Sequence, residues 1–326
     1  MTGIHLKKKK VRIHNNINQS KKTNNRLDDN DSDNDNDDND NTKMFNGNLK
    51  CSPHDNKNKK NYTCYSDDSL LKLRNYWNIR HPDKRINTVE PREIWKELKQ
   101  NMNKTCNLES CWLRQKFIKE KLDKELLEFT FAPKSPETWK KNPHEWLSSI
   151  DIENVMKQYE YAYPSFQFIG PSPIDFDSLK LYGQCVWEEL CNFDLYNHIK
   201  NGKSKIGIIF NTDPHYKGGT HWISMFIDIK KKYMYFFDSN GNSAPKEIKE
   251  FMDRVKLQGN TLGIDFKQMS NYPLEHQQSE SECGMYSLYF IIQLLTNQKE
   301  PTYFSKVKIK DEDVYNLRHE YFNEKL

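Results

Sequence analysis

Four residues in the last third of this 326-residue chain carry side chains that could together perform nucleophilic catalysis. They are His221, Asp238, Gln277 and Cys283, in that order. A thiol can attack a carbonyl once a base takes its proton, a carboxylate can orient that base, and an amide can donate to the developing oxyanion. The residue types and their order therefore predict a cysteine hydrolase.

The residues around His221 and Asp238 predict how these two side chains meet. Two β-rich runs, HWISMFIDI and KKYMYFF, are joined by a lysine-rich turn at residues 230–232, which is typical of an antiparallel hairpin. Pairing across that turn places His221 opposite Asp238 to within a residue or two. We expect the carboxylate to accept the Nδ1 proton of the ring and to stabilise the imidazolium.

Cys283 begins the most apolar helix-length segment of the chain, CGMYSLYFIIQLL. A helix that is apolar on nearly every side is buried in a core. Ser279 and Glu282 have the spacing of a capping box, which would place Cys283 in the first helical turn, where amides and the dipole favour a thiolate. Gln277 lies six residues before the thiol in a polar loop, a suitable position for an oxyanion donor.

Each of these residues taken singly has a plainer interpretation. A cysteine that starts a core helix is usually a small buried hydrophobe, a histidine on a strand is usually a satisfied surface or core residue, and DSNG is usually a turn. The four types in this order, with a glycine directly after the cysteine, favour the catalytic interpretation.

The order His, Asp, Gln, Cys resembles that of the adenain-like and Ulp/SENP-type cysteine proteases and is opposite to the papain order. The His221-Trp222 pair, the interval to Asp238 and the ending Gln277-x5-Cys283-Gly are similar to that family's motifs. Gln278 would be one position too close to the cysteine. The resemblance implies that Cys283 attacks, His221 shuttles the proton, Asp238 orients His221, and Gln277 with the Cys283 backbone amide holds the oxyanion.

A second segment, WLSS at residues 146–149 followed by Ile152, resembles the family's motif near the start of its catalytic domain. By this resemblance Trp146 and Trp222 would roof a narrow tunnel for a Gly-Gly tail. Glu282 stands where the family often has aspartate, which keeps the charge.

The segments GPSPIDFD, KIGIIFNTDPHYKGGTHW and SECGMYSLYFIIQLL are similar to the Ulp-type proteases of large cytoplasmic DNA viruses, including giant viruses and the poxvirus and asfarvirus core proteases. The resemblance spans residues 67–326, with its motifs concentrated in 146–290. It implies an α+β fold in which a central twisted mixed sheet packs against a buried helix that carries the nucleophile.

The resemblance also implies an endopeptidase that needs no cofactor and cleaves a protein substrate after a Gly-Gly-type motif. Viral structural polyproteins are the expected substrates, in the host cytoplasm at the virus factory or in the virion. An alternative is an isopeptidase acting on SUMO- or ubiquitin-like conjugates of the host. A third candidate is a non-catalytic virion or scaffold protein, which the intact set of four residues argues against.

Composition divides the chain into three parts. Residues 1–66 are rich in Asn, Asp and Lys and contain almost nothing that could form a core, so we expect a disordered tail and a chain starting at Asp67 that still folds. Residues 67–130 show apolar positions at helical spacing, with Trp77, Trp95 and Trp112 as core, and predict a helical accessory region. Residues 131–326 form the predicted catalytic domain, entered through a connector at 131–143 with three prolines.

The catalytic domain is expected to alternate helices and strands. Besides the hairpin and the cysteine helix, we expect helices near residues 150–161, 185–198, 245–257 and 311–322, and strands near 165–169, 205–211 and 263–269.

Charge and cysteine content exclude several other classes. Without the tail the chain is close to neutral, which does not fit a dedicated nucleic-acid binder. The run KKKKVR at residues 7–12 could be a nuclear signal or a polyanion contact, but a solvated charge run is the simpler interpretation. Neither a membrane-spanning stretch nor a signal peptide is recognisable.

Seven cysteines in a chain that is not expected to be secreted predict reduced thiols. Cys106 with Cys111, or Cys185 and Cys191 with His198, could suggest a metal. Neither set has two properly spaced pairs, so we expect no metal site.

Overall fold

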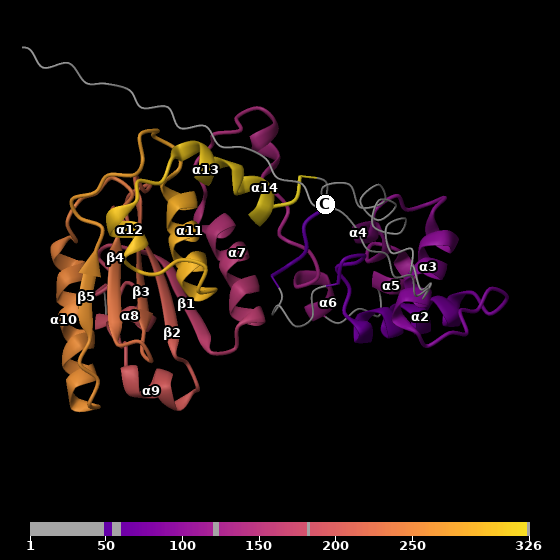
Figure 1. Ribbon diagram of the computed structural model, residues 1–326, viewed down its shortest axis with the longest axis horizontal. Helices are drawn as coiled ribbons and strands as arrows, with labels where there is room; N and C mark the ends of the chain where they lie inside the picture. The colour runs from indigo at the N-terminus through magenta and orange to yellow at the C-terminus, as the bar shows by residue number, and fades with distance from the viewer. Residues whose placement is uncertain (1–48, 54–59, 120–123, 181–182, 325–326) are drawn as a thin grey trace, which may run out of the picture.

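The computed structural model describes residues 49–53, 60–119, 124–180 and 183–324. A helical part and a sheet-containing part lie beside each other (Figure 1). The basic run at residues 7–12 and most of the predicted tail lie outside the described residues. No helix in the described part of the chain is long and apolar enough to cross a membrane.

A five-stranded mixed sheet forms the centre of the larger part, with its strands in the order β1-β2-β3-β4-β5. The first and last pairs, β1 with β2 and β4 with β5, are parallel, and the two central pairs are antiparallel. The strands are β1 (Phe166–Pro173), β2 (Lys205–Asn211), β3 (Trp222–Asp228), β4 (Tyr233–Phe237) and β5 (Lys267–Ser270).

Helices cover both faces of this sheet, so its central strands are apolar at successive positions. On β2, Ile206, Ile208 and Phe210 face one core while Ile209 faces the other, as the period of two requires. The core that contains Ile209 also holds α7 (Ser149–Ala162) and α11 (Cys283–Leu295). The core on the other face holds α8 (Glu188–Cys191), α9 (Leu195–Lys200) and α10 (Lys246–Thr261). The predicted α+β fold, with a mixed sheet against a buried cysteine helix, is confirmed.

Two predicted helices are broken in the structure. The segment 185–198 forms α8 and α9 instead of one helix, because Asp194 adopts an extended backbone and its side chain accepts a hydrogen bond from the Asn197 backbone N–H, which starts a new helix. The last predicted helix divides at Leu317 into α13 (Asp311–Asn316) and α14 (Arg318–Tyr321), after a short α12 (Tyr303–Lys306) that the sequence did not reveal.

The accessory region has a core of its own. Its helices are α2 (Asp67–Arg80), α3 (Pro91–Met102), α4 (Glu109–Trp112), α5 (Lys116–Lys119) and α6 (Lys124–Glu128). Trp77, Trp95 and Trp112 are buried among them, as predicted. Because α4, α5 and α6 are only four or five residues long as described, this core depends on packing between helices and on chain outside them.

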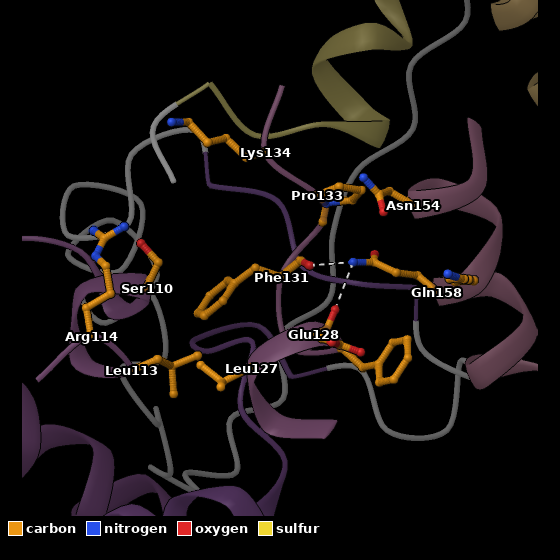
Figure 2. A pocket seen from close by; sticks show the side chains of 13 residues that line it. Ser110, Leu113, Arg114, Leu127, Glu128, Phe131, Pro133, Lys134, Asn154 and Gln158 are labelled. Carbon is orange, nitrogen blue, oxygen red and sulfur yellow. Dashed lines mark hydrogen bonds between the residues drawn. The ribbon is translucent and has the colours of Figure 1, made fainter. Parts of the chain in front are cut away.

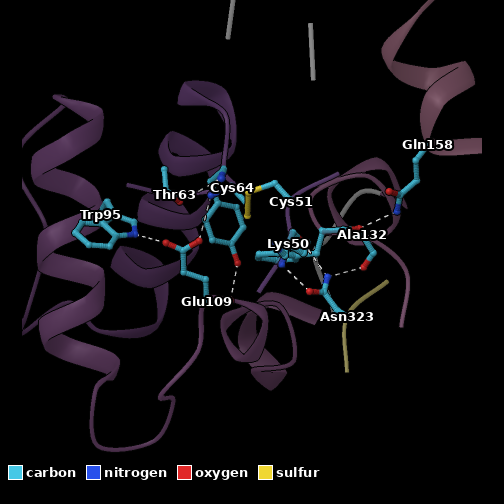
Figure 3. The surroundings of a disulfide bond; sticks show 11 residues. Lys50, Cys51, Thr63, Cys64, Trp95, Glu109, Ala132, Gln158 and Asn323 are labelled. Atoms are coloured by element: carbon cyan, nitrogen blue, oxygen red, sulfur yellow. Dashed lines mark hydrogen bonds between the residues drawn. A yellow bond between two sulfur atoms is a disulfide. The ribbon is translucent and has the colours of Figure 1, made fainter. Parts of the chain in front are cut away.

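Residues before Asp67 belong to that core, so the predicted tail boundary at Ser66 is wrong. Tyr65 is 1% exposed and stacks on Trp112 with ring centroids 5.7 Å apart. The Ser52 backbone N–H donates to the Thr130 carbonyl at 3.0 Å, and a disulfide joins Cys51 to Cys64 (Figure 3). Residues 49–53 and 60–66 are therefore part of the accessory fold, held by contacts that are distant in sequence.

The cysteines also differ from the expectation of seven reduced thiols. Disulfides join Cys51 to Cys64, Cys106 to Cys111 and Cys185 to Cys191. Cys283 is the one free cysteine among the described residues, which include all seven. The cysteines of both sets considered above as metal ligands therefore form disulfides. Which cysteines pair depends on which loops lie close together in the fold, and the spacing of cysteines in the sequence does not show this.

The C-terminal segment joins the two parts of the molecule. The Asn323 side chain donates to the carbonyls of Lys50 and Ala132 and accepts from the Lys50 backbone N–H, at 2.9, 2.8 and 2.6 Å (Figure 3). On α7, Gln158 donates to the carbonyls of Phe131 and Glu128 at 2.7 and 3.2 Å beside a cavity of about 440 Å³ (Figure 2).

The buried position of Tyr65 leads to a stability prediction. A chain starting at Asp67 should unfold at lower denaturant than one starting at Leu49, because it lacks Tyr65 and the Cys51–Cys64 disulfide. Loss of one buried aromatic side chain costs about 3–5 kcal/mol, so we expect at least that difference in the free energy of unfolding. Equal unfolding midpoints for the two chains would contradict the prediction.

Candidate active site

The hairpin brings His221 and Asp238 together as predicted. Strands β3 and β4 pair with Ser224 opposite Phe237 and Asp228 opposite Tyr233. Nε2 of His221 lies 2.7 Å from Oδ1 of Asp238. The expected ring nitrogen was wrong, since Nε2 and not Nδ1 faces the carboxylate. This orientation turns Nδ1 away from the carboxylate and makes it the nitrogen available to a thiol.

Asp238 is buried and its orientation is fixed by neighbours from two loops. Oδ1 also accepts from the Asn240 backbone N–H at 2.9 Å, and Oδ2 accepts from the Asn242 side chain at 3.0 Å. Asn271 accepts from the Asp238 N–H and donates to its carbonyl, at 3.0 and 2.6 Å. Sequence reasoning missed both side chains. Asn242 lies in the DSNGN turn and could have been found, whereas Asn271 gives no local signal.

The surroundings of His221 favour its protonated form. Burial lowers the pKa of the ring, but the hydrogen bonds to Asp238 and Cys283 and the negative charge of both groups outweigh that effect and raise the pKa to about 9. At neutral pH the imidazole is therefore cationic and carries a proton on each nitrogen. A cationic ring beside a thiol favours the thiolate, which is the reactive form of cysteine.

This protonation state can be tested by nuclear magnetic resonance. The His221 ring should titrate near pH 9, above the ordinary 6.5, and Asp238→Asn should lower that midpoint by removing a charged partner. Since the folded state holds the proton more tightly, the stability contributed by His221 is complete below pH 6.5 and is lost as the pH rises through about 9. A wild-type midpoint near 6.5 would contradict the assignment.

Cys283 occupies the first position of α11 and is buried against the sheet, as predicted. The next residue has to be small at this point. A Cβ atom on Gly284 would lie 3.0 Å from Cβ of Leu147 and 3.2 Å from Cδ1 of Trp222. Glycine therefore lets the start of the cysteine helix approach both of these side chains.

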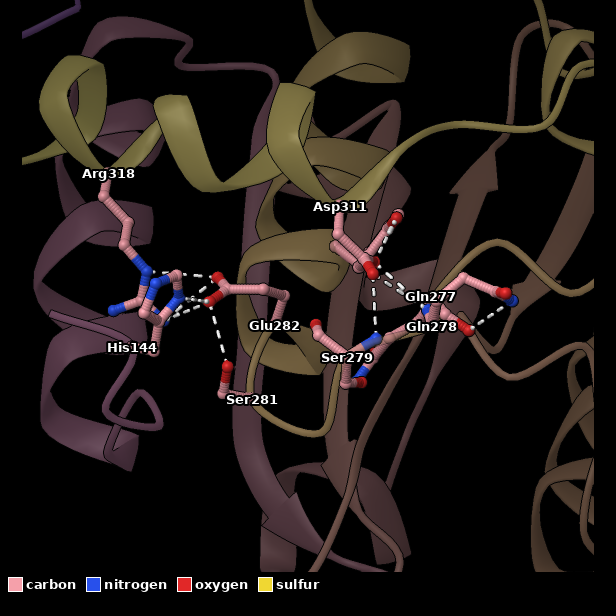
Figure 4. Close-up of polar contacts among 9 residues, drawn as sticks. His144, Gln277, Gln278, Ser279, Ser281, Glu282, Asp311 and Arg318 are labelled. Carbon is pink, nitrogen blue, oxygen red and sulfur yellow. Dashed lines mark hydrogen bonds and ion pairs between the residues drawn. The ribbon is translucent and has the colours of Figure 1, made fainter.

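The predicted capping box at the start of α11 is wrong. Glu282 is the N-cap residue, but its side chain makes no capping hydrogen bond, and the hydroxyl of Ser279 is buried without a partner in the described structure. The Glu282 carboxylate instead accepts from Nε and Nη2 of Arg318 at 3.1 and 3.2 Å (Figure 4). A charge-assisted bidentate pair is stronger than a neutral cap and wins this competition.

Gln277 is buried and linked to the end of strand β4. Its Oε1 accepts from the Ser239 hydroxyl at 2.7 Å, and its backbone N–H donates to the Ser239 carbonyl at 2.9 Å. Its amide nitrogen donates one N–H to the Ser279 carbonyl at 2.6 Å. The neighbouring Gln278 contacts Asp311 through its backbone. Because Ser239 follows Asp238, one turn positions the carboxylate and the amide together.

A groove of about 940 Å³ lies beside this site, because Leu147 and Trp222 in its wall lie against Gly284. Trp146, Leu147 and Trp222 are among its lining residues, together with Asn211, Asp213 and His215. Nε1 of Trp222 donates to the Leu147 carbonyl at 3.0 Å, which fixes the indole beside Gly284. Trp146 is 43% exposed. The two tryptophans singled out in the sequence therefore line the same groove, next to the start of the cysteine helix.

Comparison with known proteins gives one family for the C-terminal part. Residues 201–326 match the model of the Ulp1 protease family, C-terminal catalytic domain. This segment includes all four residues selected from the sequence for catalysis.

Similar proteins come from two large DNA viruses. The chain is 28% identical over 296 residues to a protein of Acanthamoeba polyphaga mimivirus that carries the name of a thiol protease, covering 83% of this chain and 92% of that protein. It is 29% identical over 254 residues to a SUMO-1 cysteine protease of African swine fever virus, covering 71% and 89%. The crystal structure of the protease of this second virus has a TM-score of 0.60 at 23% identity, covers 86% and 98%, and shares the fold.

Proposed function

We propose that Cys283 is the nucleophile of this cysteine protease, whose residues 201–326 match the catalytic domain of the Ulp1 protease family, and that the enzyme cleaves protein substrates after a Gly-Gly-type motif. The expected substrates are viral structural polyproteins. The observation that supports the proposal best is the charged His221–Asp238 pair beside the single free thiol, at the uncapped start of a buried helix.

In the proposed reaction the Cys283 thiolate attacks the scissile carbonyl and forms a thioester. Protonated His221 gives its Nδ1 proton to the amine as the C–N bond breaks. The neutral ring then takes a proton from water as the water oxygen attacks the thioester, and the C–S bond breaks to release the acid and restore the Cys283 thiolate beside the cationic ring. Asp238 keeps the ring in place through Nε2. The side chains present supply each of these steps, so the mechanism involves no cofactor.

We propose that the oxyanion formed in this attack is held by the backbone N–H of Cys283 and by Gln277. The first turn of α11 has amides without a side-chain cap, and such amides can stabilise developing negative charge. Gln277 has a second N–H besides the one accepted by Ser279. A modest movement of this side chain on substrate binding would bring that N–H to the oxyanion.

Preference for glycine follows from the walls of the groove. The Trp222 ring is anchored to the Leu147 carbonyl and contacts the start of α11. A side chain next to the scissile bond would have to displace this aromatic surface. Loss of fit of that kind typically costs about 1–3 kcal/mol, or roughly 10- to 200-fold in specificity.

Cleavage of a peptide library tests the activity and the motif together. We expect Gly-Gly-X peptides to be cut at least tenfold faster than Ala-Ala-X peptides. Trp222→Ala should reduce this ratio and lower kcat/KM, whereas Tyr196→Ala, an exposed aromatic side chain on α9, should leave both unchanged. Equal cleavage of the two peptide classes by the wild-type enzyme would overturn the Gly-Gly assignment.

A second candidate function is removal of a ubiquitin-like modifier, which the name of the SUMO-1 cysteine protease of African swine fever virus favours. Such an enzyme binds most of its substrate outside the tail. Strong dependence of kcat/KM on a folded SUMO partner would support this function, and efficient cleavage of short Gly-Gly-X peptides without such a gain would support polyprotein maturation.

The disulfides also support a proposal for where the protein is located. Of the host cytoplasm and the virion, three disulfides favour the virion, because cytosolic thiols are kept reduced. Non-reducing mass spectrometry of purified particles should find Cys51 linked to Cys64. Absence of the chain from purified particles would favour the cytoplasm.

A further inference from the structure

Glu282 and Arg318 form a buried ion pair next to the nucleophile. Their side chains are 1% and 2% exposed, and Nη2 of Arg318 lies 3.0 Å from the second carboxylate oxygen in addition to the contacts above. The Ser281 hydroxyl donates to Oε1 at 3.1 Å, and Nδ1 of His144 lies 3.6 Å from the same oxygen (Figure 4). The contacts with Arg318 draw the carboxylate toward α14, and Ser281 and His144 add two further contacts with Oε1.

The direction in which the Glu282 carboxylate points affects the nucleophile because of where Glu282 lies. It is the N-cap residue of α11 and directly precedes Cys283. A side-chain oxygen at the N-cap position can accept from the free N–H groups of the first turn, and the helix dipole attracts a carboxylate to them. Here that would occupy the amides nearest the thiol and place a negative charge beside it, and a nearby like charge disfavours a thiolate.

Two aromatic rings hold Arg318 where it keeps the Glu282 carboxylate away from these amides. Its guanidinium carbon lies 4.5 Å from the ring centre of Trp139 and 5.8 Å from that of Tyr315. Such cation–π contacts fix the plane of the guanidinium as well as its distance. Trp139 lies in the 3₁₀ helix Glu137–Lys140 and Tyr315 in α13, so the arginine is held from two directions.

The backbone of the same loop is held separately by Asp311. This carboxylate accepts from the N–H groups of Gln278 and Ser279 at 3.0 and 2.8 Å and from the Tyr286 hydroxyl at 2.9 Å (Figure 4). Tyr286 lies one turn after Cys283 in α11. The loop therefore stays anchored to the helix without Arg318, and the arginine acts mainly on the Glu282 side chain.

We propose that Arg318 is a positioning residue that holds the Glu282 carboxylate away from the start of α11, so that the first-turn amides remain available to the Cys283 thiolate and to the oxyanion. This inference rests on the proposed role of Cys283 as nucleophile. It assigns a function to a side chain 35 residues beyond the thiol that never touches the substrate.

The test measures alkylation of Cys283 by iodoacetamide against pH, with kcat and KM on a Gly-Gly-X peptide in parallel. In Arg318→Met the midpoint of alkylation should rise by about one pH unit. In the same variant kcat should fall about 10- to 100-fold while KM stays within about twofold. Arg254→Met is the control, because Arg254 on α10 forms a two-bond pair with Asp177 at 3.1 and 3.3 Å that is partly exposed and away from the thiol. Its midpoint should equal that of the wild type.

The double variant Arg318→Met with Glu282→Gln decides the question even if the single variant unfolds, because it leaves no buried charge unpaired. The proposal predicts a wild-type alkylation midpoint in this variant, since the competing carboxylate is gone. A raised midpoint in the double variant, or an unchanged midpoint in folded Arg318→Met, overturns it. Alkylation needs no substrate, so a thiol that is unreactive already in the wild type would instead remove the proposed nucleophile.

Discussion

Replacing Cys283 by alanine is expected to abolish turnover, with a loss in kcat of roughly 10⁶-fold, as for removal of the nucleophile of a hydrolase. The reason is that no other thiol can take over: the six remaining cysteines are joined in disulfides. The measurement is single-turnover cleavage of a Gly-Gly-X peptide, with thermal unfolding to confirm that the variant is folded.

Ser287→Ala provides the matched control, because Ser287 is also buried in α11, one turn after the nucleophile. Its turnover should stay within a few-fold of the wild type. Wild-type turnover in Cys283→Ala would refute the mechanism. Inactivity of the wild-type chain itself on every peptide and conjugate tested would favour the non-catalytic scaffold considered from the sequence.

His221→Ala should lower kcat by several orders of magnitude, close to the loss of the nucleophile, because both residues act as a unit. Asp238→Asn should cost appreciably less. An asparagine can still contact Nε2, and the Asn242 and Asn271 hydrogen bonds hold the backbone and the side chain in place. Pre-steady-state kinetics on the same peptide measures both losses.

The control for the histidine is His319→Ala. Nδ1 of His319 lies 2.9 Å from a Glu324 oxygen in an exposed pair outside the groove, so removal of a histidine–carboxylate contact as such should have no kinetic effect. Folded His221→Ala with unchanged kinetics would remove the assignment of the base.

The hairpin and the cysteine helix could be predicted because their signals are local. Strands β3 and β4 are short apolar runs around one turn, so the register between His221 and Asp238 follows from counting residues. Thirteen consecutive residues after Glu282 form a helix whose apolar composition requires burial. The positions of the side chains proposed for catalysis therefore followed from periodicity and turn placement.

The surrounding contacts could not be predicted because they join segments far apart in sequence. Arg318 lies 36 residues after Glu282, and Asn271 lies 33 residues after Asp238. Both are single polar residues in mixed segments, where no period marks them as buried. The capping box failed for the same reason, since a local rule cannot include a distant arginine that competes for the carboxylate.

The cysteine pairing has a practical consequence for any assay of this enzyme. A reducing agent keeps the Cys283 thiol in its active form, yet the same agent attacks the bond between Cys51 and Cys64, which closes a loop of 13 residues in the accessory region. Opening such a loop lowers stability by about 3 kcal/mol. Measured activity should therefore pass through a maximum as the reductant concentration rises, because the same reagent keeps the Cys283 thiol reduced and destabilises the accessory region.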